Sequence, residues 1–279
     1  MSDTNIQHSA PAKAPTKMAS AASVGRFITF RTITAMMLRE MSSTYGRSPG
    51  GYIWAVAEPA AGIVLLTTVF TLSGFRTPPI GTNFPIYYAT GILPFMLYTD
   101  VSSKVAQSLR FSKSLLAYPR VTFMDALLAR FALNFSTQIL VFYVLISIIL
   151  LLYETRTSLN FEKISLALAM GGALGFGVGA VNCYLTTRFQ VWGRVWAITN
   201  RPMFILSCII FLFEAIPEPY SSYLWYNPVA HITGQMRSAF YPYYNPTYIS
   251  PAYVFGISGV MTILGLISLK KYHKEILNR

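Results

Sequence analysis

Long apolar stretches separated by short polar segments fill most of the chain after residue 50. Six of them approach the length of about 20 apolar residues that a helix needs to cross the hydrocarbon of a bilayer. The third stretch, which ends in LVFYVLISIILLLY, is the clearest, whereas the fifth is short unless residues 196–201 extend it. The sequence therefore predicts an all-α membrane protein with six transmembrane helices, at residues 53–74, 85–104, 131–153, 164–187, 202–216 and 252–269.

The region before the first span divides into two parts. Residues 1–23 are polar, rich in Ala, Ser, Pro and Lys, and lack the apolar stretch of a signal peptide, so we expect a disordered cytosolic tail. Residues 24–45 follow a helical period that predicts an amphipathic helix in the membrane interface. A helix packed against the rest of the protein would show the same period. Residues 46–279 form the predicted transmembrane domain.

Three glycines recur every four residues in the fourth span, at Gly171, Gly175 and Gly179. Small residues at this spacing let a neighbouring helix approach closely, so they predict a helix-packing face. A glycine-rich nucleotide loop is excluded, because such a loop follows a β-strand and no strand pattern precedes these glycines.

The composition agrees with a lipid environment. Charged residues make up only 11% of the chain, compared with roughly 25% in soluble domains. The net charge of +12 does not require nucleic acid as a partner, because 18 of the 22 Lys and Arg residues fall in the segments that are cytosolic if the N-terminus is cytosolic. This asymmetry follows the positive-inside rule for an even number of spans and predicts that both termini are cytosolic.

The segment between the fifth and sixth spans, residues 217–251, is too polar to cross a membrane and is rich in tyrosine. Within it, residues 227–240 predict a short helix with Pro228 in its first turn, and further prolines lie on both sides of that helix. A short fifth span followed by this pattern predicts a re-entrant periplasmic segment, because non-helical backbone at membrane depth must be buried or line a cavity.

The sequence shows no pattern of catalytic or metal-binding residues. The three histidines lie far apart, the ten acidic residues are scattered, and no G-x-x-x-x-G-K-[ST] loop is present to bind nucleotide phosphates. We therefore expect no metal site, no cofactor and no catalysis in this chain. Charged residues at span depth remain functional candidates, although Asp100 and Lys104 could simply pair: Glu58, Asp100, Lys104, Arg130 and Arg201.

Four segments, taken in order, resemble a known family. They are YGRSPGGYIWAVAEP at 45–59, GILPFMLYTD at 91–100, LLAYPRVTFMDALLAR at 115–130 and WYNPVAHITGQMRSAFY at 225–241. Together they resemble the membrane-spanning permease subunit of ABC-2 type exporters, in particular the branch that exports capsular polysaccharide. The resemblance extends from about Val24 to the C-terminus, and none of the four segments is as specific as a nucleotide-binding motif.

The resemblance implies a function and a set of partners. It implies a permease subunit, not itself an enzyme, that moves lipid-linked capsular polysaccharide across the bacterial inner membrane. It also implies a homodimer, two cytosolic nucleotide-binding ATPase subunits that hold ATP and Mg, and a periplasmic polysaccharide co-polymerase-type adaptor. Export of another glycan, such as O-antigen or teichoic acid, and a non-transporting role in membrane assembly remain alternatives.

The resemblance also places functional residues on the cytosolic side. In this family the segment between the second and third spans carries a short helix that couples the permease to the ATPase, here at 110–122. The residues assigned to this coupling are Arg110, Lys113, Tyr118, Pro119 and Arg120. A plain basic loop is the alternative. On the predicted amphipathic helix at 24–45 and the loop that follows it, Arg39 and Arg47 are expected to meet the lipid phosphate where the substrate enters.

Two interpretations of the aromatic segment remain open. It forms an aromatic belt at the outer membrane interface, or an outer gate whose tyrosines stack on sugar rings, and the two are compatible. The gate hypothesis assigns roles to Tyr223, Trp225, Tyr226, Asn227, His231, Arg237, Tyr241, Tyr243 and Tyr244.

Overall fold

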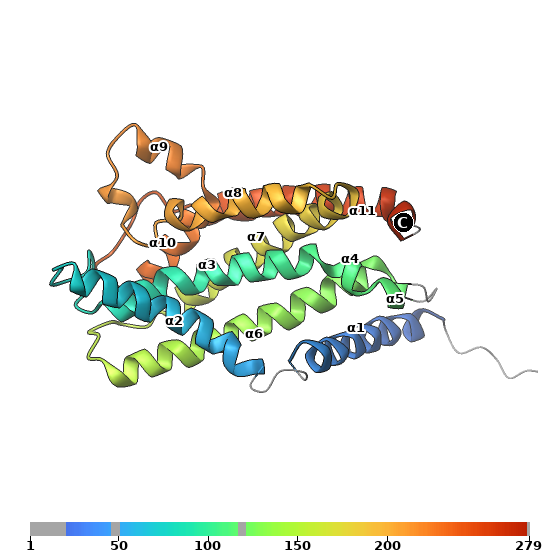
Figure 1. The fold of residues 1–279 in the computed structure, drawn as a ribbon, viewed down its shortest axis with the longest axis horizontal. Helices are drawn as coiled ribbons and strands as arrows, with labels where there is room; N and C mark the ends of the chain where they lie inside the picture. The colour runs from blue at the N-terminus through green and yellow to red at the C-terminus, as the bar shows by residue number, and fades with distance from the viewer. Residues whose placement is uncertain (1–20, 46–50, 117–120, 278–279) are drawn as a thin grey trace, which may run out of the picture.

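The computed structural model describes residues 21–45, 51–116 and 121–277. Within these residues the chain is helical and has no strand, and the long helices run largely side by side (Figure 1). The elements are, in order, α1 (Ala21–Tyr45), α2 (Gly51–Leu72), α3 (Phe84–Ala106), α4 (Ser108–Phe111), α5 (Lys113–Leu116), α6 (Phe123–Leu152), α7 (Phe161–Arg188), α8 (Trp192–Leu206), the 3-10 helix η1 (Phe213–Ala215), α9 (Tyr220–Trp225), α10 (Pro228–Phe240) and α11 (Pro251–Leu277).

Within the described residues, four helices are long and apolar enough to cross a membrane. They are α2, α6, α7 and α11, with apolar stretches at Ile53–Leu72, Phe123–Leu152, Phe161–Arg188 and Pro251–Tyr272. α3, the second predicted span, has 23 residues and carries Asp100 and Lys104 in its second half. α8 has only 15 residues. The all-helical prediction is confirmed, and four of the six predicted spans meet these criteria.

The fifth predicted span differs most from the structure. α8 begins at Trp192 and ends at Leu206, whereas the apolar pattern predicts a span at 202–216. Pro202 lies inside α8 rather than at its start. Residues 207–212 leave the helix although they are mostly apolar, because side chains of other helices bind their backbone carbonyl groups, as described below.

α3 lies at the centre of the bundle and presents three faces to three sets of neighbours. One face packs against α7, a second faces α8 across a cavity, and a third faces α2 and α6. Figure 1 shows α3 running between α8 and α6. Its first half is almost entirely buried in the main hydrophobic core. α3 therefore contacts α2, α6 and α7 directly and shares a cavity with α8.

The contact between α3 and α7 confirms the packing face predicted from the glycine row. Cβ atoms built at Gly171, Gly175 and Gly179 would lie 3.0, 3.0 and 2.7 Å from side chains of α3. The facing side chains recur at the same spacing of four residues: Leu97, Val101 and Val105. The missing side chains let the two helices approach closely, which fixes α3 against the most buried of the four apolar helices.

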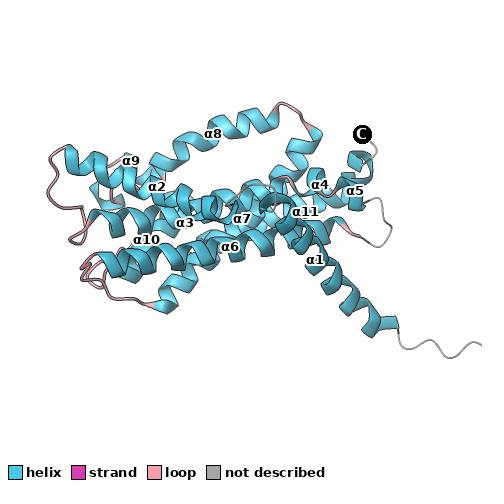
Figure 2. Cartoon of the chain, turned by 60° about the horizontal axis from the view of Figure 1, so that its bottom comes forward, coloured by secondary structure: helices cyan, strands magenta, loops and turns pink. Residues whose placement is uncertain are grey.

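α1 is helical over the predicted range and leaves the bundle at an angle (Figure 2). Its Met36 is buried against Ala126 and Ala129 of α6. Phe30 and Leu38 of α1 are 70% and 61% exposed. One side of the helix therefore packs against protein, while other apolar side chains remain free to contact lipid. Its location in the membrane interface stays a prediction.

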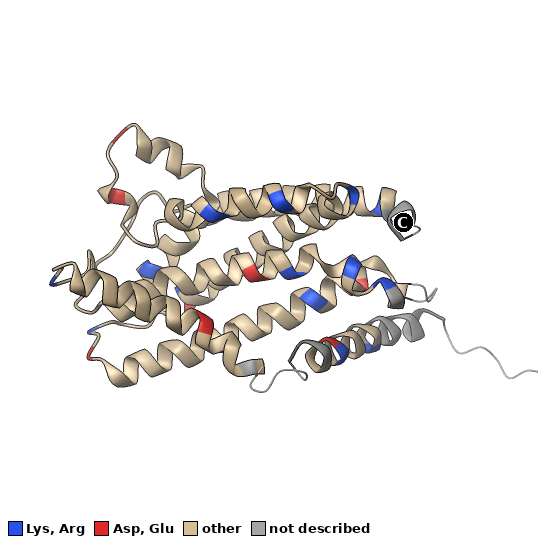
Figure 3. Cartoon of the chain, viewed as in Figure 1, with Lys and Arg blue, Asp and Glu red and all other residues tan. Residues whose placement is uncertain are grey.

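The two ends of the molecule differ in charge. α4, α5 and the C-terminal part of α11 lie at one end, whereas α9 and α10 lie toward the other (Figure 1). Figure 3 shows Lys and Arg gathered mostly toward the α4–α5 end. The exposed Glu214 and Glu218 belong to the segment that leads into α9, toward the opposite end. The uneven charge of the sequence is therefore an uneven charge of the folded molecule.

Candidate functional site

A cavity of about 620 Å³ separates α3 from α8. α3 lines it with residues between Phe95 and Ala106, and α8 lines it with residues between Gly193 and Phe204. On each helix these residues recur every three or four positions, so one face of each helix is turned toward the cavity. Arg110 of α4 lines it as well and donates a hydrogen bond from Nη2 to the carbonyl oxygen of Thr186 on α7.

Aromatic side chains line much of this cavity. Phe95 and Tyr98 come from α3, and Trp196 and Phe204 come from α8. The rings of Phe95 and Phe204 meet edge to face with their centroids 5.5 Å apart, which brings α3 and α8 together. Aromatic rings give a large contact area at a low cost in side-chain entropy. The cavity therefore suits a ligand that presents flat, partly apolar faces.

Two polar atoms in the cavity wall have no hydrogen-bond partner among the described residues. One is the hydroxyl oxygen of Ser102, a residue that is only 2% exposed, and the other is the amide oxygen of Asn200. Buried polar atoms are nearly always paired with protein or water. Two unpaired atoms on facing helices therefore offer hydrogen-bond partners to a polar ligand in the cavity.

α8 is only loosely held against the bundle. None of its 15 residues is buried. Its apolar side chains at Val195, Ile198 and Ile205 are exposed and lie off the face that lines the cavity. A helix with few buried contacts has low local stability and can move relative to its neighbours. α8 therefore lines the cavity without burying any of its own residues within this chain.

The end of α8 is fixed by side chains from α10. Asn227 Nδ2 donates to the carbonyl oxygen of Leu206 at 2.9 Å, and Thr233 Oγ1 donates to that of Ser207 at 2.8 Å. Buried carbonyl groups outside a regular helix must find donors elsewhere, and here α10 supplies them.

Arg237 continues this series of contacts. Its Nη2 donates to the carbonyl oxygen of Ile209 at 2.7 Å and its Nη1 to that of Phe211 at 3.1 Å. Tyr87 of α3 donates to Ile210 at 3.3 Å. Thr233 and Tyr87 were not among the residues predicted from the sequence. Thr233 and Arg237 are four residues apart and therefore lie on the same face of α10. This spacing could have indicated that Thr233 contacts the same segment as Arg237.

His231 is fully buried and holds three segments together. Its Nδ1 accepts a hydrogen bond from the backbone N–H of Ser250 at 3.2 Å, so Nε2 carries the proton and donates to the carbonyl oxygen of Trp225 at 2.8 Å. Burial lowers the pKa of His231 below its usual value, which favours the neutral ring that both contacts require.

The predicted gate residues fall into two groups. Tyr223, Tyr226 and Tyr243 are exposed at the α9–α10 end, with Tyr243 98% exposed. The second group supports the structure: His231, Arg237 and Tyr241 are buried, Asn227 caps α10, Trp225 Nε1 donates to Tyr248, and Tyr244 donates to the Glu214 carboxylate. None of the nine lines the α3–α8 cavity. Only the exposed tyrosines are free to act as a gate, and that role stays a prediction.

Comparison with known proteins identifies the fold family. Residues 31–241 match the sequence profile of ABC-2 type transporters. This chain belongs to the ABC-2 type transporter family. The matched region begins in α1 and ends just after α10, so it contains the cavity, both of its walls and the segment that fixes α8.

Three relatives illustrate the breadth of this similarity. The chain is 28% identical to the polysialic acid transport protein KpsM of Escherichia coli over 84% of its own length and 91% of the relative. It is 25% identical to the capsule polysaccharide export inner-membrane protein CtrC of Neisseria meningitidis serogroup A, covering 88% and 92% of the two chains. It is 24% identical to the O-antigen export system permease protein RfbA of Klebsiella pneumoniae, covering 87% and 92%. Together with its apolar helices, these relatives make the chain a multi-pass membrane protein.

The segment predicted to couple this ABC-2 chain to an ATPase contains two short helices rather than one. α4 and α5 are separated by Ser112, and they carry the exposed Arg110 and Lys113. Tyr118, Pro119 and Arg120 lie outside the described residues, as does Arg47. Arg39 is described and is exposed on α1. The structure thus places three of the seven residues assigned to coupling and to substrate admission.

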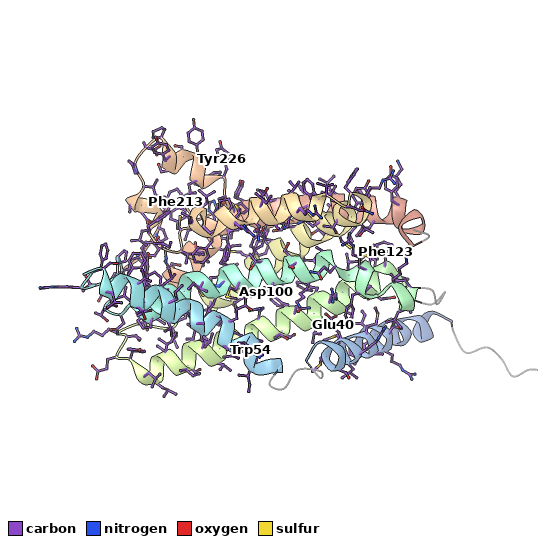
Figure 4. The ribbon with its side chains drawn as sticks, viewed as in Figure 1. Glu40, Trp54, Asp100, Phe123, Phe213 and Tyr226 are labelled. Carbon is purple, nitrogen blue, oxygen red and sulfur yellow. The ribbon has the colours of Figure 1, made fainter. Side chains whose placement is uncertain are left out.

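A second polar site lies between α2, α3 and α6. A cavity of about 260 Å³ there is lined by Glu58, Asp100, Lys104 and Gln138. Figure 4 labels Asp100 near the middle of α3. Gln138 Nε2 donates to the Asp100 carboxylate, and within the described part of the chain no ion pair joins Asp100 to Lys104. The pairing that the sequence allowed is therefore replaced by a contact between α3 and α6.

Proposed function

We propose that this chain is the permease subunit of an ATP-driven exporter that carries capsular polysaccharide across the bacterial inner membrane. The cavity between α3 and α8 carries this proposal, because it combines aromatic walls with unpaired polar atoms on facing helices. Sugar rings present apolar faces and hydroxyl edges, which match these two kinds of surface. The relatives named for capsule polysaccharide export support the same class of cargo.

The charges around the cavity favour an anionic or phosphate-bearing cargo. Arg110 and Arg201 both line it, and the carboxylates of Glu58 and Asp100 lie in the separate site on the other side of α3. Guanidinium groups bind phosphate and carboxylate with paired hydrogen bonds. A lipid-linked polysaccharide whose phosphate passes Arg110 and Arg201 would fit this distribution. Arg39 and Arg47 would admit the lipid phosphate before it reaches the cavity.

The proposed topology has six spans, with α3 and α8 crossing in addition to the four apolar helices. The α4–α5 end faces the cytosol, because most Lys and Arg residues lie toward it. Both termini are then cytosolic, α1 lies in the inner interface, and the segment around α9 and α10 re-enters from the periplasm. The short α8 crosses only together with the non-helical segment that follows it, whose carbonyl groups α10 satisfies.

The proposed assembly is a homodimer with two ATPase subunits that supply ATP and Mg. Each ATPase docks on the α4–α5 segment and the residues that follow it, including Arg110, Lys113, Tyr118, Pro119 and Arg120. The periplasmic adaptor meets the opposite end, where Tyr223, Tyr226 and Tyr243 are exposed. An energy-supplying partner is required, because the chain has no nucleotide-binding loop of its own.

Export of O-antigen is the second candidate function. The O-antigen permease RfbA matches a similar share of this chain as the capsule relatives do. A teichoic acid would present the same combination of sugar faces and phosphate. Only the chemistry of the transported glycan separates these candidates.

The test combines this chain and its ATPase in proteoliposomes and measures ATP-dependent transfer of lipid-linked glycans of each class. Trp196→Ala should lower transfer about fivefold, since an aromatic contact contributes roughly 1 kcal/mol. Ile198→Ala is the matched control, because Ile198 lies on α8 but off the cavity face. Transfer that needs no ATPase, or a chain that binds no ATPase at all, would contradict the proposal and support an assembly role.

A further inference from the structure

One arginine, Arg130, contacts three other elements at the α4–α5 end of the bundle. It belongs to α6, and its Nη1 donates to the carbonyl oxygen of Lys104 in the last turn of α3 at 3.0 Å. Its guanidinium carbon lies 4.1 Å from the ring centroid of Phe111 on α4. Its Nε lies 3.0 Å from Oε1 of Glu40 on α1. A single side chain therefore touches α1, α3 and α4.

The pair formed by Arg130 and Glu40 is almost completely buried. The two side chains are 6% and 5% exposed, and Figure 4 labels Glu40 where α1 approaches α6. Burying two charges carries a large desolvation penalty, and well-packed apolar residues often serve stability equally well. Stability alone is therefore a weak reason for an ion pair at this position.

One apolar cluster is shared by α1 and the second short helix of the coupling segment. Leu115 of α5 and Met37 of α1 pack on the cluster formed by Met36, Ala126 and Ala129. The start of α6 is fixed by a capping box, in which Thr122 and Asp125 exchange side-chain and backbone hydrogen bonds. α1 thus packs on the start of α6, in a cluster that Leu115 of α5 also joins.

We propose that the Glu40–Arg130 pair relays movement of the α4–α5 segment to α1 and to the end of α3. When α4 shifts, the Phe111 ring carries the guanidinium with it, and Arg130 pulls on Glu40 and on the carbonyl oxygen of Lys104. The displaced turn of α3 includes Ser103 and Ala106, which line the α3–α8 cavity. Glu40 and Arg130 are positioning residues, and this inference rests on the proposed docking of an ATPase at α4 and α5.

The test uses the complete complex of this chain with its ATPase subunits. Glu40→Gln keeps the shape of the side chain but removes the charge, and Glu40→Leu with Arg130→Met replaces the whole pair by apolar residues. Glu154→Gln, an exposed carboxylate on the loop after α6, is the matched control. Three quantities are measured: ATPase subunits bound, ATP hydrolysed, and glycan exported per ATP.

A spin-label distance between Leu38→Cys on α1 and Leu140→Cys on α6 reports the movement itself. Both positions are exposed, and the natural Cys183 and Cys208 are buried and so remain unlabelled. In the wild type this distance should change between the nucleotide-free and ATP-bound complexes. In Glu40→Gln, and in the double variant, it should stay fixed.

The relay predicts normal ATPase binding in Glu40→Gln but roughly tenfold less glycan exported per ATP, a loss within the usual range of coupling between sites. The double variant should recover thermal stability and remain uncoupled. If a stable double variant exports like the wild type and keeps the distance change, the pair is only structural and the inference is overturned. If the wild type itself binds no ATPase, the proposed function fails instead, whatever the variants do.

Discussion

Arg237 lies over the ring of Tyr87, with its guanidinium carbon 4.3 Å from the ring centre. The two side chains come from α10 and α3, and both donate hydrogen bonds to the non-helical segment after α8. A cation over an aromatic face is favourable where water is excluded, and Arg237 is only 1% exposed. This contact fixes the segment that follows α8 to the buried first half of α3.

Replacing Arg237 by methionine should release that segment. Hydrogen bonds from a charged donor contribute about 1.5–3 kcal/mol each, so losing two of them should lower the free energy of unfolding by at least about 3 kcal/mol. The midpoint of thermal unfolding in detergent measures this loss. Arg237→Lys should also be destabilising, because an ammonium group lacks the planar fork that reaches two carbonyl oxygens.

Arg76→Met is the control for this experiment. Arg76 is exposed in the loop between α2 and α3, so its loss should change the midpoint little. An Arg237→Met variant as stable as the Arg76→Met variant would show that the carbonyl groups of Ile209 and Phe211 find other partners.

The close approach of α7 to α3 gives a second prediction. A Cβ atom at Gly179 would lie 2.7 Å from Cβ of Val105 and 2.9 Å from the backbone oxygen of Ser102. Gly179→Ala should therefore force the helices apart and cost about 1–3 kcal/mol. Gly256→Ala on α11 is the control, because no atom lies within 4 Å of the added carbon, and alanine there should gain up to about 1 kcal/mol of helix propensity.

Equal stability of the Gly179 and Gly256 variants would mean that α3 and α7 are free to separate. Circular dichroism at increasing temperature distinguishes the two outcomes.

The buried His231 predicts a dependence of stability on pH. Burial lowers its pKa in the folded protein below the usual 6.5, so the unfolded chain binds a proton first as the pH falls. The stabilising contribution is therefore complete above pH 6.5 and is lost as the pH falls from 6.5 toward the lowered pKa of the folded state. A protonated ring would also turn Nδ1 into a donor that faces the backbone N–H of Ser250.

Unfolding measured across this pH range should lose most of that dependence in His231→Asn. The same dependence should persist in His273→Gln, which serves as the control for a histidine elsewhere in the chain. A pH profile unchanged by His231→Asn would assign the effect to another group.

The sequence predicted best those features that depend on neighbouring residues. α10 runs from Pro228 to Phe240 with Pro228 in its first turn, as its local pattern indicated, and Asn227 caps it. The glycine row on α7 also signalled its role, because close helix packing depends on one helix face. Local chemistry is sufficient for both features.

Contacts between distant segments could not be predicted in this way. Arg237 was taken for a gate residue because of its position in a polar, aromatic segment. Its partners, Phe211 and Ile209, lie 26 and 28 residues earlier in the chain. The bounds of α8 were wrong for the same reason, since apolar residues 207–212 would continue a helix if α10 did not bind their carbonyl groups. The cavity likewise depends on which faces of α3 and α8 meet.

The unpaired polar atoms of the cavity predict opposite effects on stability and transport. Ser102→Ala and Asn200→Leu remove polar atoms that have no partner among the described residues. An unpaired buried polar group costs about 1–3 kcal/mol, so each variant without cargo should unfold about 2–4 °C higher or more. Export should fall, because the cargo loses the same hydrogen bonds.

Asn134→Leu is the control: Asn134 Nδ2 donates to the carbonyl oxygen of Arg130 at 2.8 Å, so its loss should destabilise the protein. If Ser102→Ala or Asn200→Leu lowered stability and left export unchanged, those atoms would have a structural role, and the path of the cargo would have to lie elsewhere.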